Sequence, residues 1–299
     1  MSRHALALPW IAGLLAAALL PAVLLPGAVL AADFRGNVNV ESGGTLEVEL
    51  SAGSVEIDSH DEEQVEVEAR ADSFGGSFRF ELTSDGKDAR LTGSGSSWFG
   101  FSASSVSVRI TVPREYAIDL ETGGGRVEID DVEGDIVVHT NGGRIEVDGA
   151  VGQVEVETSG GRISIDDVDG DVRARTSGGS IDVSEVTGEV DVRTSGGHIQ
   201  IHDVGGPVFA HTSGGRISVR FNDLAEGEIQ TSGGSIEVEV PEGSGIDLDA
   251  STSGGRVSLD DDVSIRGSVD RAHVVGEING GGSELRLRTS GGNVRLRAR

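Results

Sequence analysis

The sequence predicts an all-β fold, a parallel β-solenoid with rungs of 18 residues and an N-terminal β-rich capping segment. A Thr-x-Gly-Gly element recurs at five successive intervals of 18 residues, which is typical of solenoids. Apolar and polar residues alternate between these elements, as they do in strands with one buried face. The chain has 46 glycines but only eight Phe, two Trp and one Tyr, so small β-branched side chains must fill its core. The repeated threonines are Thr122, Thr140, Thr158, Thr176, Thr194 and Thr212.

Residues 1–31 have the layout of a secretory signal peptide. Arg3 and His4 precede a long apolar run rich in Ala and Leu, and small residues follow at Ala31 and Ala32. The alternative is an uncleaved anchor, because the run is long enough to span a bilayer. Prolines near its end and the small residues favour cleavage, and no later stretch could span a membrane. We therefore expect an exported protein in the periplasm, at the cell surface or outside the cell.

The charge and cysteine content exclude several classes of partner. The chain contains 50 acidic and 24 basic residues, for a net charge of −26, so it should repel nucleic acid and anionic membrane surfaces over most of its area. Such charge also keeps a protein soluble, and this explains most of it. The absence of cysteine fits an exported protein without disulfides and excludes a lipid anchor on an N-terminal cysteine.

Residues 32–118 lack the 18-residue marker but contain alternating runs such as TLEVEL and SVSVRITV. We interpret this segment as a β-rich cap that leads into the solenoid, because an open end would expose unpaired strands. The repeats themselves occupy residues 119–299.

Each rung is expected to contain two short strands that share one inward face. In the rung that begins at Arg126, a corner of the DDVEGD type and a corner of the TSGG type separate the strands. The corner glycines provide either backbone conformations closed to other residues or room for close approach. The inward residues of this rung are Val127, Ile129, Val132, Ile136, Val138 and Thr140.

The strands could pair in parallel with their counterparts 18 residues away, or antiparallel with their neighbours through hairpins. Parallel stacking places each residue over its equivalent in the next rung, so the identical columns favour it. The outward column Glu155, Arg173, Asp191 then alternates in charge, and such opposite pairs contribute about 0.2–1 kcal/mol each.

The repeat becomes irregular toward the C-terminus. Thr231 and Thr252 follow at intervals of 19 and 21, and Thr289 follows after 37, which suggests two rungs with a degraded marker near residues 279–282. In the last segment Leu or Val alternates with Arg. We expect these arginines to face outward, pair with the acidic body and discourage end-to-end stacking. They are Arg286, Arg288, Arg295 and Arg297.

The stretch VPREYAIDLETGGGRVEI at 112–129, followed by repeated TSGG rungs, resembles a bacterial β-strand-repeat family. That family carries the name "putative adhesin" and is a domain of unknown function. The resemblance covers most of residues 33–299. It implies a right-handed parallel β-helix at or outside the cell envelope, with no established catalytic residues. Some relatives are linked to envelope-stress sensing.

Two groups of side chains are considered as metal ligands. Acidic corners could offer oxygens to calcium, but their charge fades along the stack, and a solvated corner is the preferred interpretation. His198 and His202 would share an outer face but lie about 13 Å apart at ~3.3 Å per residue, too far for one ion. No cofactor or metal is therefore expected. The acidic corner residues are Asp130, Asp131, Asp166, Asp167, Asp260, Asp261 and Asp262.

The TSGG serines are not candidate nucleophiles, because a catalytic residue is singular and these recur without a histidine to serve them. The threonines are expected to form an inward polar ladder that bonds to backbone or to itself. The remaining candidates are Trp98, Phe99 and Phe101, three aromatics in the Ser/Gly-rich stretch 94–105. They are either the anchors of a binding site or a plug for the open end of the solenoid.

The leading functional hypothesis is an exported, non-enzymatic solenoid, an adhesin-like or envelope-associated binding or scaffold protein. Its expected partner is an envelope component, a glycan or a protein. The alternative is a polysaccharide-active β-helix enzyme, a lyase or hydrolase, although rungs of near-constant length leave little chain for a cleft. A third hypothesis is a structural unit that polymerises through its ends, which the arginine-rich terminus opposes.

Overall fold

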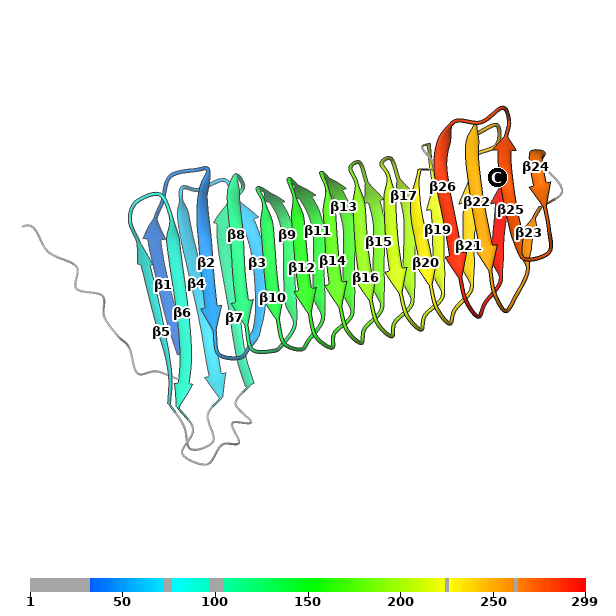
Figure 1. Ribbon diagram of the computed structural model, residues 1–299. Helices are drawn as coiled ribbons and strands as arrows, with labels where there is room; N and C mark the ends of the chain where they lie inside the picture. The colour runs from blue at the N-terminus through cyan, green and yellow to red at the C-terminus, as the bar shows by residue number, and fades with distance from the viewer. Residues whose placement is uncertain (1–32, 73–76, 97–104, 224–225, 261–262) are drawn as a thin grey trace, which may run out of the picture.

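The computed structural model describes residues 33–72, 77–96, 105–223, 226–260 and 263–299. Within these residues the regular structure is entirely β, and no helix is long and apolar enough to cross a membrane. The strands form two sheets, a 14-stranded sheet A and a 13-stranded sheet B. The sheets face each other along a stack that runs from β1 and β5 at one end to β23 and β24 at the other (Figure 1).

In chain order, the strands of the first half are β1 (Asp33–Asn39), β2 (Gly44–Leu50), β3 (Ser54–His60), β4 (Gln64–Asp72), β5 (Ser77–Ser84), β6 (Ala89–Ser96), β7 (Ser105–Pro113), β8 (Tyr116–Thr122), β9 (Val127–Glu133), β10 (Ile136–Thr140), β11 (Ile145–Val151), β12 (Val154–Thr158), β13 (Ile163–Asp169) and β14 (Val172–Thr176). Those of the second half are β15 (Ile181–Val186), β16 (Val190–Thr194), β17 (Ile199–Val204), β18 (Val208–Thr212), β19 (Ile217–Phe221), β20 (Gly227–Thr231), β21 (Ile236–Val240), β22 (Ile246–Thr252), β23 (Val257–Leu259), β24 (Ile265–Val269), β25 (His273–Ile278), β26 (Ser283–Thr289) and β27 (Val294–Ala298).

The central rungs confirm the parallel solenoid. Odd-numbered strands from β9 to β19 belong to sheet B and even-numbered strands from β8 to β20 to sheet A, so each rung contributes one strand to each sheet. Ile145 is the parallel register partner of Ile163, and Val154 is the partner of Val172. The antiparallel meander is therefore wrong for this part of the chain.

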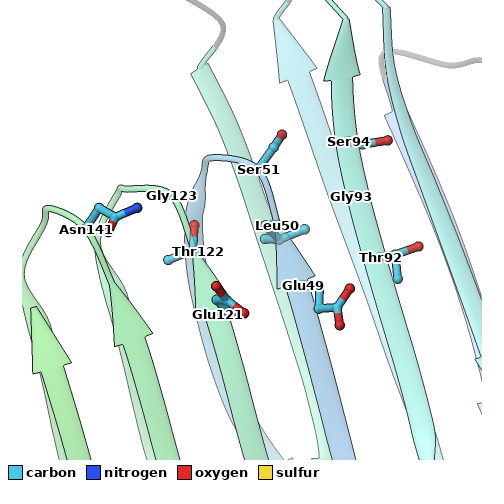
Figure 2. A pocket seen from close by; sticks show the side chains of 10 residues that line it. All are labelled: Glu49, Leu50, Ser51, Thr92, Gly93, Ser94, Glu121, Thr122, Gly123 and Asn141. Atoms are coloured by element: carbon cyan, nitrogen blue, oxygen red, sulfur yellow. The ribbon is translucent and has the colours of Figure 1, made fainter.

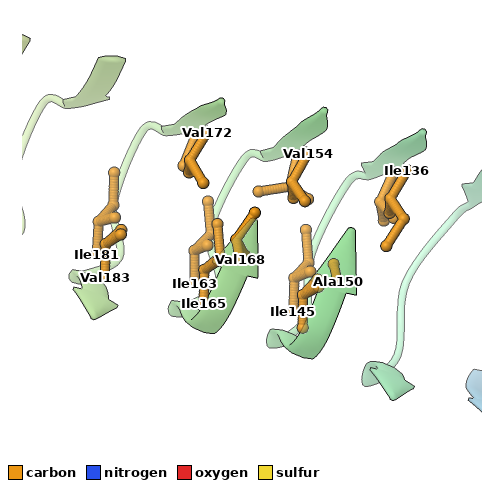
Figure 3. Close-up of a cluster of buried hydrophobic side chains, with 14 of the residues drawn as sticks. Ile136, Ile145, Ala150, Val154, Ile163, Ile165, Val168, Val172, Ile181 and Val183 are labelled. Atoms are coloured by element: carbon orange, nitrogen blue, oxygen red, sulfur yellow. The ribbon is translucent and has the colours of Figure 1, made fainter. Parts of the chain in front are cut away.

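The core lies between the two sheets and consists of the predicted inward residues. Ile136, Val154 and Val172 point from sheet A toward Ile145 and Ile163 of sheet B (Figure 3). All are at most 2% exposed, as expected for close-packed side chains. Because every rung repeats this set, the core is one continuous apolar column.

A kink in the sheet B strands β9, β11, β13, β15 and β17 explains why their inward residues are separated by two positions and then by three. Asp131, Asp167, Glu185 and Asp203 have φ between 51° and 57°, and Gly149 has a φ of 69°. This left-handed residue adds one outward position, so Ile129 and Val132 both reach the core. Asp and Gly are the residues that most readily adopt this conformation.

The second glycine of each TSGG corner is required by close approach between rungs. A Cβ on Gly161 would collide with the carbonyl oxygen of Gly143, and one on Gly179 would collide with that of Gly161. Room for close approach, one of the two expected roles, thus explains this column.

The threonine column forms the expected polar ladder, and its partners are backbone groups. Thr176 is 6% exposed, and its hydroxyl donates to the Gly161 oxygen of the preceding rung at 3.1 Å. The same Oγ1 accepts the N–H of Gly179 at 3.3 Å. Thr194 and Thr212 repeat both bonds, so these buried hydroxyls tie each corner to the rung beneath it.

At the N-terminal end, spatial order departs from chain order. The rung β2–β3 lies between the rung β6–β7 and the rung β8–β9. Tyr116, which follows the Val-Pro of β7, is fully buried and donates its hydroxyl to the Lys87 oxygen at 2.6 Å. Burial, and then the charges of Asp88 and Asp85, raise the pKa of Tyr116 to about 12. Phe34, Phe78 and Phe80 pack together in the outermost strands at this end.

At the C-terminal end, spatial order again departs from chain order, and this corrects two expectations. The rung β26–β27 lies between the rung β20–β21 and the rung β22–β23, inside the stack. The 37-residue interval before Thr289 therefore does not contain two regular rungs, because β24 and β25 form an antiparallel hairpin on β22. The arginine-rich strands are not the exposed end of the solenoid. The expectation that they discourage end-to-end stacking from that position is therefore wrong. They do pair with the acidic body, for example Arg288 with Asp249 at 3.2 Å.

Candidate functional site

Trp98, Phe99 and Phe101 lie outside the described residues, so their role as partner-binding residues stays a prediction. The corner from which this segment departs is described. Here a pocket of about 420 Å³ opens between the ends of β2, β6 and β8 (Figure 2). Glu49 and Glu121 are the charged residues among its described lining, so the pocket is acidic. Glu49 pairs with Arg90 at 3.3 Å.

The acidic corners of the sequence occupy the outer face of sheet B near the N-terminal end. Asp130, Asp148 and Asp166 are register partners on β9, β11 and β13. Burial, and then the charges of Glu128 and Asp58, raise the pKa of Asp130 to about 6. Burial, and then Asp166, also raise the pKa of Asp148. The raised pKa values mean that ionisation of these stacked carboxyl groups is less favourable than that of free ones.

The other aspartates of the predicted cluster do not join this face. Asp131 and Asp167 are the left-handed kink residues beside it, whereas Asp260 follows β23 at the far end and pairs with Arg297 at 3.6 Å. Asp261 and Asp262 lie outside the described residues. Among the residues that the structure describes, no group of three or more His, Asp or Glu has the geometry of a metal site.

Of the two histidines, His198 precedes β17 and His202 lies within it. The Nδ1 of His198 accepts the backbone N–H of Arg216 at 3.0 Å. His202 is half-buried, and its Nδ1 is buried without a hydrogen-bond partner in the described part of the chain. They are four positions apart along extended chain, about 13 Å at ~3.3 Å per residue. His198 therefore acts as a corner acceptor between neighbouring rungs.

The outer face of sheet A has the predicted alternation of charge. Arg173 lies in register between Glu155 and Asp191 and approaches both, at 3.7 and 3.8 Å. Arg175 is the register partner of Glu157 but pairs with Glu155 at 3.4 Å. Asp191 also receives Arg193 at 3.3 Å. These arginines are neutralised by neighbouring carboxylates, so this face offers little net positive charge.

Along the stack, sheet B changes from acidic to more polar and basic side chains, and the sequence predicted only part of this change. The column that begins with Asp130 continues through Ser184, His202 and Arg220, and then through Glu239 to Arg297. The inserted β27 also brings Arg295 between Glu237 of β21 and Ser258 of β23. The fading of acidic charge was visible in the repeat. The position of β27 was not, because it depends on which rungs become neighbours.

Two grooves follow this polar and basic half of sheet B at the TSGG corner. The first has a volume of about 630 Å³ and includes Arg162, His198 and Arg216. The second has a volume of about 520 Å³ and includes Arg256 and Arg295. Arg216 and Ser235 line both grooves, so they are neighbouring parts of one surface.

Comparison with known proteins gives a family and several structural likenesses. Residues 44–297 match the family model described as Toastrack DUF4097. No curated protein matches the chain significantly. Similar solved structures include a "putative adhesin" from Bacteroides fragilis, with 10% identity over 89% of this chain and 97% of that chain and a TM-score of 0.43.

Two further likenesses are to proteins of Parabacteroides distasonis. One is a "putative adhesin" with 13% identity, 88% and 96% coverage and a TM-score of 0.36. The other is a "putative lipid binding protein" with 10% identity, 89% and 96% coverage and a TM-score of 0.26. The function is therefore inferred from the residues of this chain.

Proposed function

The chain belongs to the Toastrack DUF4097 family, and we propose that it is an exported, non-enzymatic solenoid that binds envelope components in the manner of an adhesin or scaffold. The observation that supports this is the regular parallel register of the rungs from β9 to β17. Short corners connect these strands, so the outer faces present regular rows of side chains. Such rows suit extended contact with a long partner.

The side chains of the repeats support binding more than chemistry. The threonine hydroxyls that recur in each rung already donate to and accept from backbone groups, so they are not poised as nucleophiles. The arginines of sheet A are paired with carboxylates. Export is proposed from residues 1–31, which have the composition of a signal peptide.

A polysaccharide-active enzyme is the second candidate, and one observation favours it. The pKa of Asp130 is raised to about 6, and Asp148, its register partner on β11, also has a raised pKa. Neighbouring carboxyl groups of which one stays protonated can act as acid and base. Against this, the pair lies on the outer face of sheet B, and burial followed by the charges of neighbouring carboxylates already explains the shift. Glycosidases surround such a pair with a cleft that holds the substrate.

The test uses the full chain, expressed with residues 1–31 in a bacterial host and purified from the exported fraction. Immobilised protein is incubated with separate polysaccharide, protein and lipid fractions of a bacterial envelope, with and without calcium. We expect capture of at least one fraction and no shortening of polysaccharides on size-exclusion chromatography. Shortening that disappears in Asp130→Asn would favour the enzyme instead. Retention in the cytoplasm with an intact N-terminus would contradict export.

A further inference from the structure

The two neighbouring grooves on sheet B form one basic surface, which is built on the corners that precede four strands. Four corner residues, one from each of β19, β21, β27 and β23, precede their strands in this spatial order. They are Arg216, Ser235, Asn293 and Arg256. Arg216 and Arg256 are therefore three rungs apart, about 14 Å at ~4.8 Å per rung, and Arg295 projects from β27 between them.

The hydrogen bonds that join these corners use backbone N–H groups and the side chains of Asn293, Ser235 and His198. They do not involve the guanidinium groups of the arginines. Asn293 accepts the backbone N–H of Arg256 on Oδ1 at 3.0 Å, and its own N–H donates to Ser235 Oγ at 3.1 Å. His198 accepts the backbone N–H of Arg216 at 3.0 Å. Arg216, Arg256 and Arg295 are all exposed.

These three arginines also differ from most others in their electrostatic surroundings. None of them forms an ion pair with a carboxylate of the described residues, whereas neighbouring Arg162 pairs with Asp182 at 3.8 Å and Arg297 with Glu237 at 2.9 Å. In a chain with 50 acidic and 24 basic residues, a group of unneutralised arginines along one groove is a local reversal of charge. Exposed guanidinium groups of this kind favour carboxylate, sulfate or phosphate ligands.

The other residues that line the two grooves indicate which kind of anionic ligand fits there. Ser218, Ser258 and Gln200 offer hydroxyl and amide groups that match the hydroxyls of a sugar. No Phe, Tyr or Trp is among the described lining, so the large stacking platforms that favour single-stranded nucleic acid are missing there. Asp182 and Glu237 also border the grooves and would repel a ligand as densely charged as duplex DNA, with one charge per ~1.7 Å.

We propose that this surface, from Arg162 on β13's corner to Arg256 on β23's corner, binds a linear acidic polysaccharide laid along the solenoid axis. Sparse carboxylates on the polymer contact Arg216, Arg256 and Arg295, and the serine, asparagine and glutamine side chains contact its hydroxyls. This inference rests on the proposed binding function and specifies its ligand class.

The test measures binding of the full chain to polygalacturonate by isothermal titration calorimetry, with neutral dextran, duplex DNA and polyglutamate as comparison ligands. The groove variant is Arg216→Gln, Arg256→Gln and Arg295→Gln. The control is Arg70→Gln, Arg79→Gln and Arg266→Gln, three exposed arginines that also form no ion pair with described carboxylates. Both variants change the net charge equally. Circular dichroism and the thermal midpoint confirm that each variant is folded.

We expect the unmodified protein and the control to bind polygalacturonate with similar affinity. Loss of each charge-assisted contact should weaken binding about tenfold, so the groove variant should lose most of its affinity. Equal binding by the two variants would overturn the proposal, as would equal or tighter binding of DNA or polyglutamate. If the groove variant does not fold, Ser218→Glu places a negative charge in the same groove and must weaken binding in its place.

Different results would contradict the acidic-polysaccharide ligand and the proposed binding function. Capture of an envelope protein or a neutral glycan without binding of polygalacturonate would overturn the acidic-polysaccharide assignment and leave the proposed binding function intact. Failure to capture any envelope fraction would contradict the proposed function itself.

Discussion

Thr289 donates its hydroxyl to the carbonyl oxygen of Gly234 at 2.7 Å, across 55 residues of the chain. The bond is the same corner bond that Thr176 makes to Gly161 in the regular repeats. A C-terminal rung thus uses the repeat's own chemistry to join a rung that is distant in sequence. It separates two rungs, β20–β21 and β22–β23, that follow each other along the chain.

The inserted position of β27 predicts that its core residues are as important as those of the central rungs. Leu296 is 1% exposed, between β21 and β23, whereas Leu259 of the edge strand β23 is half-buried. Leu296→Asp should lower the free energy of unfolding by about 3 kcal/mol or more, because it buries an unpaired charge. Leu259→Asp should cost clearly less. Urea denaturation of both variants measures the difference, and a larger loss for Leu259→Asp would contradict the inserted arrangement.

The inward and outward faces of a central rung can be separated by two adjacent substitutions. Ile163 is fully buried, so Ile163→Asp should be severely destabilising or prevent folding. Ser164 faces outward between Glu146 and Asp182 of the neighbouring rungs. Ser164→Asp should therefore cost only about 1 kcal/mol or less, from like-charge repulsion across strands. The thermal midpoints give the comparison, and equal losses would mean that the two faces are wrongly assigned.

The stacked carboxylates predict a specific dependence of stability on pH. The pKa of Asp130 is raised to about 6 in the folded protein, above its ordinary value of 3.8, so the folded state binds the proton more tightly than the unfolded state. Its contribution to stability is therefore favourable at low pH and is lost as the pH rises from about 4 through 6. Asp130→Asn should stabilise the protein at pH 8.

The measurement is the difference in unfolding free energy between Asp130→Asn and the unmodified protein at pH 5 and pH 8. This difference should be larger at pH 8. Asp119→Asn, an exposed carboxylate on sheet A, is the control for loss of one negative charge. A difference for Asp130→Asn that is independent of pH would contradict the raised pKa.

The aromatic segment remains a candidate for partner recognition. If Trp98, Phe99 and Phe101 are binding residues, replacing all three with Ser should abolish capture of the partner and leave the thermal midpoint nearly unchanged. Early melting or aggregation would instead indicate a structural plug. If the triple variant keeps both binding and stability, the partner is recognised along the rungs. Binding by the groove variant of sheet B then tests which part of the rungs is used.

The local pattern of the sequence was sufficient to predict the central rungs. Alternation together with the 18-residue repeat places Val127, Ile129 and Val132 on one face, and they are buried on β9. The sequence also predicted the inward threonine ladder, because a buried polar residue must find a hydrogen-bond partner, and the structure shows that this partner is backbone. These features depend on contacts between equivalent residues 18 positions apart, so the period itself specifies them.

Only the tertiary structure decided the order of the rungs at the two ends. The apolar residues of β26–β27 and β22–β23 follow the same alternation, so either rung satisfies the ladder of β20–β21 locally. The choice depends on the packing of the whole end, including the β24–β25 hairpin that covers β22. That choice places Arg295 between Glu237 and Ser258 and completes the basic groove from Arg216 to Arg256. A local repeat specifies what a rung can pair with, but the total burial of the fold selects its neighbours.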